Sequence, residues 1–261
     1  MGQSLSHDVA IVTGAGRGIG RAIALSLAAE GAAVGVFART EEEITATAAL
    51  ISDAGGRAIA LQLDVRDAAA VRAAAEETAS RLGRVTLLVN NAGTPGPAGL
   101  DWEVDPEAWF ECIEVIVRGA FLLCQAVTPG MIARGSGRII NIASISGTRA
   151  FPRITATSIA KTALIRFSEG LAAQLDGHGV RVFAVHPGIV RTRLLESYGF
   201  QLPEERFVGP ERAGSLCARL ASGRYDVLSG RFLGIEDDLE ALLTRVGEIT
   251  ARELYTLRLN A

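Results

Sequence analysis

The stretch "VAIVTGAGRGIGRAIALSLAAEGAAV", residues 9–34, decides the fold class of this chain. An apolar strand, a glycine-rich turn and an alanine-rich helix follow one another directly, and a second apolar run begins where the helix ends. Gly14, Gly18 and Gly20 permit a tight turn, a close approach of the backbone to a pyrophosphate, and close packing of the helix on the strand. The N-terminus of the helix then faces the phosphates. The stretch predicts a nucleotide site, with a purely structural glycine turn as the alternative.

Outward from this unit, short β-branched runs alternate with alanine-rich stretches as far as about residue 190. This alternation is typical of a parallel sheet covered by helices on both faces. We expect strands at "VAIVTG", "AAVGVFA", "AIALQLDV", "TLLVNNA", "GRIINIAS" and "VRVFAVHPG", with a seventh at "LSGRFLGI". We expect helices near residues 18–29, 41–54, 68–82, 106–133 and 157–176. The sequence therefore predicts an α/β fold, a Rossmann-type doubly wound parallel sheet of about seven strands, in a single domain spanning residues 1–261.

Two segments near the C-terminus depart from this alternation. Residues 193–212, "RLLESYGFQLPEERFVGPER", carry aromatic side chains just beyond a strand end, which is a common place for a substrate lid. Residues 237–261 have helical periodicity and are expected to form a helical tail.

The helix near residues 106–133 has a clear start signal, because Asp105 can cap free amides and Pro106 suits the first helical position. Its body is apolar over more than one face, so it needs cover on both sides. We expect this helix and the one near 157–176 to pack on the sheet and on a second subunit of a homodimer or homotetramer. A helix buried within one chain is the alternative.

The composition of the chain argues against several kinds of binding partner. The net charge of −3 and the lack of a basic stripe argue against a nucleic acid. No apolar run is expected to be long enough, and free enough of charge, to span a bilayer. The cysteines, at positions 112, 124 and 217, show no metal or redox spacing, and the three histidines lie far apart. A cytoplasmic protein with a small-molecule substrate and no metal site is therefore favoured.

Three short motifs follow one another along the chain in an order that is typical of one protein family. Thr13–Gly20 follows the pattern TGxxxGxG, "NNAG" occupies residues 90–93, and "HPG" occupies residues 186–188. With these motifs the chain resembles the short-chain dehydrogenase/reductase family from residue 8 to about residue 192. The resemblance implies an oxidoreductase that binds a nicotinamide cofactor.

The resemblance also implies which residues contact the cofactor. Asp64 and Val65 would hold the adenine, and Val190 and Thr192 would hold the carboxamide of the nicotinamide. The full implied set is Gly14, Arg17, Gly18, Ile19, Gly20, Arg39, Asp64, Val65, Asn91, Ala92, Gly93, Lys161, Pro187, Gly188, Val190 and Thr192.

The end of the second strand indicates which nicotinamide cofactor is bound. An acid there binds the free ribose diol, whereas a nearby arginine accepts the extra phosphate of NADP. The strand ends "VFART", with Arg39 and no acid, and Arg17 stands in the glycine turn. Because arginine can pair with a phosphate through two hydrogen bonds, NADP(H) is favoured over NAD(H). The alternative is that both are ordinary surface arginines.

The catalytic positions match the family only in part. In the family, a tyrosine four residues before a lysine passes the proton, a serine polarises the carbonyl, and an asparagine continues the relay. Ser144 and Lys161 match, and Lys161 is the only lysine in the chain. Thr157 stands in place of the tyrosine and Ile116 in place of the asparagine. A threonine hydroxyl is too short and too weak an acid to replace a phenol, so we expect a site with Ser144, Thr157 and Lys161 but without the usual relay.

Three groups are candidates for the missing proton donor: Tyr198 in the predicted lid, Ser144, and a water held by Thr157 and Lys161. An aromatic residue in a lid more often covers the substrate.

Three arginines flank these positions. Arg149, Arg153 and Arg193 either present positive charge to an anionic or polyphenolic substrate, or are solvated loop residues.

Three functions are consistent with this pattern. The first is an NADP(H)-dependent oxidoreductase that acts on a carbonyl, an alcohol or an activated double bond with a non-standard proton source. The second is a redox-neutral enzyme on the same fold, such as a cyclase, dehydratase or isomerase. The third is a catalytically inactive NADP(H)-binding subunit that pairs with an active homologue. The first is our prediction, because the fold and cofactor elements are retained.

Overall fold

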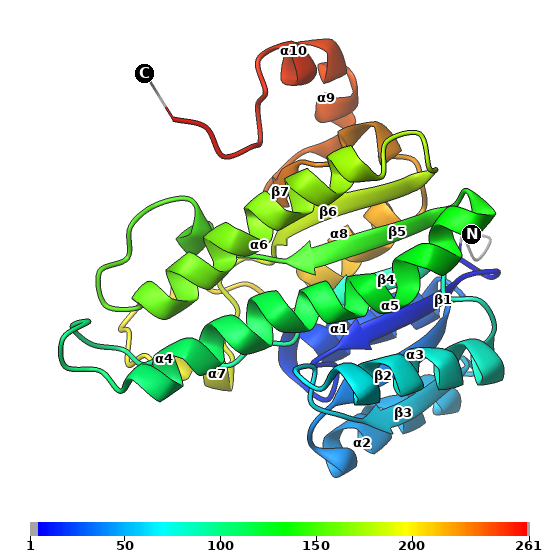
Figure 1. Ribbon diagram of the computed structural model, residues 1–261, viewed down its shortest axis with the longest axis horizontal. Coiled ribbons are helices and arrows are strands. Elements are labelled where there is room, and N and C mark those ends of the chain that lie inside the picture. The colour runs from blue at the N-terminus through cyan, green and yellow to red at the C-terminus, as the bar shows by residue number, and fades with distance from the viewer. Residues whose placement is uncertain (1–4, 260–261) are drawn as a thin grey trace.

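The computed structural model describes residues 5–259 of the chain. At its centre lies a sheet of seven strands in the order β3-β2-β1-β4-β5-β6-β7 (Figure 1). Every neighbouring pair is parallel. The strands are β1 (Val9–Thr13), β2 (Ala33–Ala38), β3 (Ala58–Gln62), β4 (Leu87–Asn90), β5 (Gly137–Ile142), β6 (Val180–His186) and β7 (Phe232–Gly234). The predicted doubly wound Rossmann-type fold is confirmed.

Helices cover both faces of the sheet. They are α1 (Gly18–Ala29), α2 (Glu41–Asp53), α3 (Ala68–Leu82), α4 (Pro106–Ile113), α5 (Gly119–Arg134), α6 (Thr155–Gln174), α7 (Arg193–Glu196), α8 (Glu211–Ala221), α9 (Leu239–Leu243) and α10 (Val246–Ala251). In Figure 1, α5 and α6 cross in front of the sheet.

The hydrophobic core lies in two layers, one on each side of the sheet. In β1, Ala10 and Val12 pack in the layer shared with α1 and α8, whereas Val9 and Ile11 pack in the layer shared with α3 and α5. All five residues of β1 are buried. A strand buried on both faces explains why the sequence shows continuous apolar runs there.

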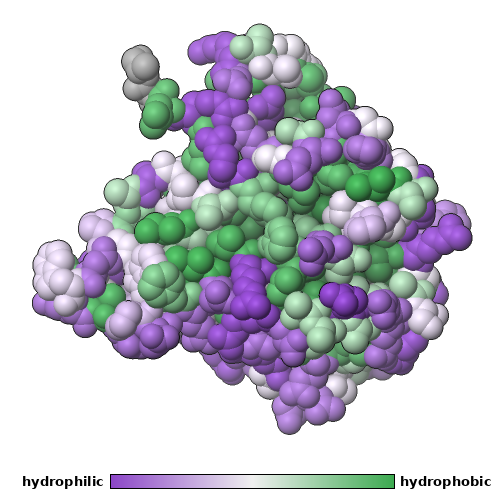
Figure 2. All heavy atoms as spheres, in the orientation of Figure 1, coloured by the Kyte–Doolittle hydropathy of each residue, from purple (hydrophilic) through white to green (hydrophobic). Residues whose placement is uncertain are grey.

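The long helix over residues 106–134 corrects one expectation from the sequence. A π-helical turn, Glu114–Arg118, joins α4 to α5, so that one helix runs for 29 residues and contains an 18-residue window with a mean hydropathy of 1.6. By length and composition it is able to cross a bilayer, and the expectation that no run would be long enough was wrong. Its apolar character has a local cause, because one side packs against the sheet and α6. Figure 2 shows further hydrophobic side chains gathered over α5 and α6 on the outer side.

The order of the strands reverses between β1 and β4, and in an open parallel sheet the crevice at the carboxyl ends of these strands is the expected ligand site. The chain runs from β1 to β2 and β3 on one side, and then returns to β4 on the other side of β1. Residues 193–212, which contain α7 and a short 3-10 turn at Glu204–Arg206, follow the end of β6 at the same edge. Their role as a lid stays a prediction.

Candidate cofactor and active site

The glycine turn between β1 and α1 has a geometry that side-chain-bearing residues rarely adopt. Gly14 and Gly18 have φ values of +61° and +54°, in the left-handed region. A Cβ on Gly20 would lie 2.2 Å from the carbonyl oxygen of Gly14 and 2.4 Å from Nδ2 of Asn91. The turn therefore requires glycine at these positions.

The N-terminus of α1 is open to a ligand. Arg17 precedes the helix without making a side-chain cap, and the first turn contains no acidic residue. The first amides of a helix have no partner within the helix and carry partial positive charge. The backbone of Gly18, Ile19 and Gly20 thus fits the pyrophosphate of a dinucleotide.

Residues 91–93 join the end of β4 to the glycine turn. The backbone amides of Asn91 and Ala92 donate to Oγ1 of Thr13 at 3.0 and 2.9 Å. The side-chain amide of Asn91 donates to the carbonyl of Thr13 at 2.9 Å. A Cβ on Gly93 would lie 3.8 Å from Cδ1 of Leu194, so the base of the predicted lid overhangs this edge.

Both arginines proposed for a ribose phosphate lie beside glutamates. Arg17 donates to Oε1 of Glu43 in α2 at 3.1 Å. Nη1 of Arg39 lies 3.9 Å from Oε1 of Glu111 in α4, which is too long for a hydrogen bond. Both arginine side chains are more than half exposed. They remain accessible to a phosphate, although each already has a negative neighbour.

Asp64, the predicted adenine ligand, is held by Arg66. The guanidinium of Arg66 binds Oδ2 of Asp64 at 2.6 Å and Oε1 of Glu111 at 3.2 Å. The hydrogen bond from Arg66 lowers the pKa of Asp64. The neighbouring Val65 is buried, and it packs against α5 where a Cβ on Gly119 would lie 2.6 Å from Cγ2 of Val65. Sequence patterns did not point to Glu111 or Arg66 as neighbours of Asp64.

The residues predicted beside the nicotinamide follow the end of β6. Pro187 and Val190 are buried, and Gly188 has a φ of +79°. Thr192 caps α7, because its Oγ1 accepts from the amide of Leu195 at 3.2 Å. A Cβ on Gly18 would lie 3.5 Å from Cγ2 of Thr192, so this segment reaches the glycine turn. The structure thus brings the predicted nicotinamide segment next to the glycine turn.

Ser144 and Lys161 are positioned by the turn after β5. Oγ of Ser144 accepts from the amide of Ser146 at 3.1 Å, which leaves the hydroxyl hydrogen of Ser144 free to donate. Nζ of Lys161 donates to the carbonyl of Ile142 at 2.6 Å. Burial lowers the pKa of Lys161 to about 8. A Cβ on Gly147 would lie 2.7 Å from the carbonyl carbon of Lys161, so this turn and α6 are tightly packed.

Thr157 is buried in α6 and meets a tyrosine from the predicted lid. Its Oγ1 lies 2.5 Å from the hydroxyl of Tyr198, and it also accepts from the amide of Gly96 at 3.4 Å. Burial raises the pKa of Tyr198 to about 12, although its hydrogen bond with Thr157 opposes the shift. The phenol of Tyr198 is therefore neutral at physiological pH.

The long helix supplies the other wall beside Thr157. Sγ of Cys112 lies 3.6 Å from Oγ1 of Thr157, and burial raises the pKa of this thiol. Ile116 is almost fully buried in the π-helical turn, and a Cβ on Gly93 would lie 3.7 Å from its Cγ1. The apolar side chain of Ile116 therefore lies against the crevice. The sequence did not single out Cys112 as a neighbour of Thr157.

A buried polar chain ties α6 to the sheet. Nδ2 of Asn90 donates to Oδ1 of Asn141 at 2.8 Å, and Nδ2 of Asn141 donates to Oγ of Ser168 at 2.8 Å. Ser168 in turn donates to the carbonyl of Leu164 at 2.7 Å. Among the residues of this chain of hydrogen bonds, only Asn90 belongs to a motif that the sequence analysis identified.

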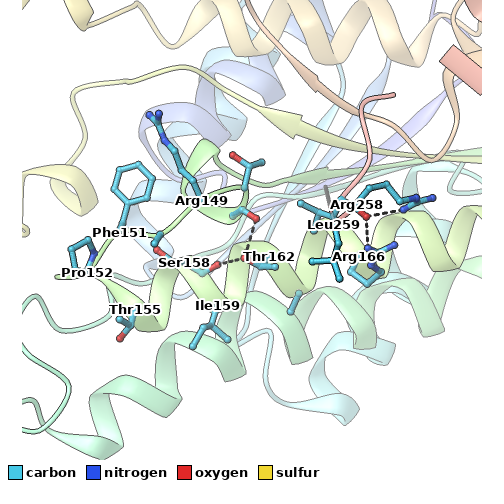
Figure 3. Close-up of a pocket in the computed structure, with 15 residues that line it drawn as sticks. Arg149, Phe151, Pro152, Thr155, Ser158, Ile159, Thr162, Arg166, Arg258 and Leu259 are labelled. Carbon is cyan, nitrogen blue, oxygen red and sulfur yellow. Dashed lines mark hydrogen bonds between the residues drawn. The ribbon is translucent and has the colours of Figure 1, made fainter. Parts of the chain in front are cut away.

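The flanking arginines do not converge on one point. Figure 3 shows Arg149 and Phe151 beside a pocket of about 660 Å³ on the outer side of α6, where Ser158 and Thr162 lie rather than Thr157. The guanidinium of Arg149 lies 5.3 Å from the ring centre of Phe151. Arg193 instead pairs with Glu43 at 3.4 Å. Within residues 5–259, no three His, Cys, Asp or Glu side chains are placed to share a metal ion.

Comparison with known proteins decides the family. The model of the short chain dehydrogenase family matches residues 8–201. The chain belongs to the short-chain dehydrogenase family. A 3-oxoacyl-(acyl-carrier-protein) reductase of Synechocystis sp. is 37% identical over 225 residues, which cover 84% of this chain and 91% of the relative.

Solved short-chain dehydrogenases extend the likeness to the fold. A variant of actinorhodin polyketide ketoreductase with NADPH has a TM-score of 0.82 at 32% identity, over 90% of this chain and 97% of that chain. Gluconate 5-dehydrogenase from Burkholderia cenocepacia, in complex with NADP and tartrate, has a TM-score of 0.83 at 32% identity, over 91% of this chain and 96% of that chain. As a short-chain dehydrogenase, this protein is an oxidoreductase with a nicotinamide cofactor site.

Proposed function

We propose that this short-chain dehydrogenase is an NADP(H)-dependent oxidoreductase that interconverts a carbonyl and an alcohol, or reduces an activated double bond, on a small organic substrate. We further propose that Tyr198 of the lid supplies the proton that the family obtains from a tyrosine at the position of Thr157. The contact of 2.5 Å between Oγ1 of Thr157 and the hydroxyl of Tyr198 carries this proposal.

The contact offers a reason for the altered relay. With a threonine at position 157, space beside α6 is left for a phenol from another segment, and Tyr198 reaches Thr157 from 41 residues further along the chain. Because Thr157 has one donor and can also accept, it holds the incoming hydroxyl in either direction. A lid that carries the acid completes the site only when it closes over the substrate.

Ser144 and Lys161 would have the other roles at the reacting centre. The free hydroxyl hydrogen of Ser144 would polarise the substrate carbonyl, and Lys161 would hold the nicotinamide ribose. Bound NADPH would supply the hydride. Tyr198 would give its proton to the substrate oxygen as that hydride reaches the carbonyl carbon, and solvent would reprotonate the phenolate when the lid opens. Arg17 and Arg39 support NADP(H) over NAD(H), because no acid ends β2.

The relatives support the substrate class. Two of them are named as reductases of ketoacyl or polyketide groups, and a third as a dehydrogenase of gluconate. The described cysteines are buried and unpaired, which supports a reducing compartment such as the cytoplasm.

A homodimer or homotetramer is part of the proposal. Phe110 of α4, Phe121 of α5 and Ile159 of α6 are 60%, 49% and 48% exposed. Such large apolar side chains on adjacent helices are typical of an interface. A second copy of the chain is the partner that we propose for this surface.

The test is the oxidation of NADPH, followed by its absorbance, with the pure protein and a panel of ketones, β-ketoacyl thioesters and enones. Stoichiometric conversion of substrate and NADPH would support the proposal. Substrate conversion without a change in NADPH would instead indicate a redox-neutral enzyme. Binding of NADPH without any turnover across the panel would favour the inactive-subunit hypothesis.

A further inference from the structure

Glu43 is a carboxylate between the glycine turn and the lid. It lies in the first turn of α2, and its Oε1 accepts from Arg17 at 3.1 Å and from Arg193 at 3.4 Å. Arg17 belongs to the glycine turn, and Arg193 opens α7 at the base of the lid. One oxygen atom thus joins three segments that are distant in the sequence.

Packing fixes Glu43 at this place. A Cβ on Gly16 would lie 2.8 Å from Cβ of Glu43, so the side chain rests against the glycine turn. Thr47, one turn further along α2, donates to the carbonyl of Gly16 at 3.3 Å, and Nε of Arg21 donates to the same carbonyl at 3.0 Å. The side chain of Glu43 is only 24% exposed, compared with 53% for Arg17 and 71% for Arg193. The carboxylate is held in position, and the two arginines are the movable partners.

We infer that Glu43 is a specificity-determining residue that tunes the choice between NADPH and NADH and couples this choice to the lid. The inference rests on the proposed function, since it concerns the same cofactor site. A 2′-phosphate that pairs with Arg17 must compete with Glu43 for this guanidinium. Once Arg17 has turned to the phosphate, Oε1 of Glu43 is left to Arg193 alone, so NADPH strengthens the attachment of the lid and NADH does not.

The first test is a fluorescence titration with NADPH and NADH of the wild type, Glu43→Gln and Glu42→Gln. Glu42 is exposed in the same helical turn, so Glu42→Gln removes the same charge without removing a partner of Arg17. In Glu43→Gln, the ratio of the Kd for NADH to the Kd for NADPH should rise about three- to fivefold, as expected for the loss of one partly exposed competing ion pair. The ratio should stay at the wild-type value in Glu42→Gln.

Two outcomes would overturn the inference in different ways. If both cofactors bind and the ratio in Glu43→Gln equals the wild-type ratio, or if Glu42→Gln raises it equally, Glu43 has no specific role. If the wild type binds neither cofactor, the proposed function itself fails and the inference falls with it.

The second test follows the lid by limited trypsin digestion, with cleavage measured in residues 191–206. In the wild type, saturating NADPH should slow this cleavage more than saturating NADH does. In Glu43→Gln this difference should disappear, and it should persist in Glu42→Gln. Equal protection by both cofactors in the wild type would overturn the coupling to the lid.

Discussion

The two halves of the crevice are built in different ways. The glycine turn and residues 91–93 are held together by backbone groups and glycine contacts, such as the approach of Gly20 to the carbonyl of Gly14. Beside α6, the site is made of side chains from three separate segments, namely Cys112 of α4, Thr157 of α6 and Tyr198 of the lid. A backbone cradle tolerates little change in its sequence. A cluster of side chains can be reassembled when one residue changes, which is what we propose for Thr157 and Tyr198.

The largest effect is expected when the hydroxyl of Tyr198 is removed from the side-chain cluster beside α6. In Tyr198→Phe, kcat should fall by roughly 10²- to 10⁴-fold, because the ring still covers the substrate while the proton donor is lost. The measurement is steady-state NADPH oxidation with the best substrate of the panel. Because burial raises the pKa of Tyr198 to about 12, the phenol stays protonated, and the wild-type reduction rate should show no loss from its deprotonation up to about pH 10.

Tyr225→Phe is the matched control. Tyr225 is also buried, and its hydroxyl donates to Oε1 of Glu240 at 2.6 Å. This change should leave kcat within about twofold of the wild type, because the residue lies away from the crevice. Wild-type activity in Tyr198→Phe would show that Tyr198 only covers the substrate and does not donate the proton. The proposed catalytic role of the side-chain cluster would then be wrong.

The next largest effect is expected from substitutions in the glycine turn. In Gly20→Ala, the new Cβ would meet the carbonyl oxygen of Gly14 at 2.2 Å, so the turn must shift and NADPH binding should be lost. We expect the free energy of unfolding to fall by about 2–3 kcal/mol in urea denaturation. Gly18→Ala is the comparison, because its Cβ would be in ordinary contact with Thr192 and only the positive φ is strained. It should cost about 1–2 kcal/mol. An equal cost for both would show that close approach does not set the turn.

Lys161 gives a smaller effect that depends on pH. Burial lowers the pKa of Lys161 from 10.5 to about 8. As the pH rises, the folded protein therefore loses this proton at a lower pH than the unfolded chain does. Between these two pH values the unfolded state binds more protons, and the free energy of unfolding rises with pH. Relative to Lys161→Met, the wild type should gain on the order of 1–3 kcal/mol between about pH 7.5 and pH 10, as measured by urea denaturation without cofactor. Parallel pH profiles for the two proteins would contradict this prediction.

Cys112 should have the smallest effect. Burial raises the pKa of its thiol, so the group is neutral, and in Cys112→Ala the hydroxyl of Thr157 keeps Tyr198 as a partner. We expect kcat within about twofold of the wild type and a loss of stability of about 1 kcal/mol. Cys217→Ala, at a buried thiol on α8, is the control for packing alone. A large loss of activity in Cys112→Ala only would make the thiol part of the side-chain site.

The sheet, the glycine turn and the order of the motifs were predictable from the amino-acid sequence. These features are local: an apolar run predicts a buried strand, and glycines at fixed spacing predict the turn that follows it. The helix over residues 106–134 was also foreseen at nearly its full length, although the π-helical turn within it was not.

Which side chains contact one another could be read only from the folded chain. Tyr198 was one of three candidates for the proton donor on the sequence, and the fold alone placed its hydroxyl on Thr157. The pairing of Glu43 with Arg17 and Arg193 joins residues that are up to 150 positions apart. No periodicity reports such contacts, because they depend on how α2, α6 and the lid are folded over the ends of the strands. Backbone conformation is encoded residue by residue, whereas the partners of a side chain are set by the packing of the whole chain.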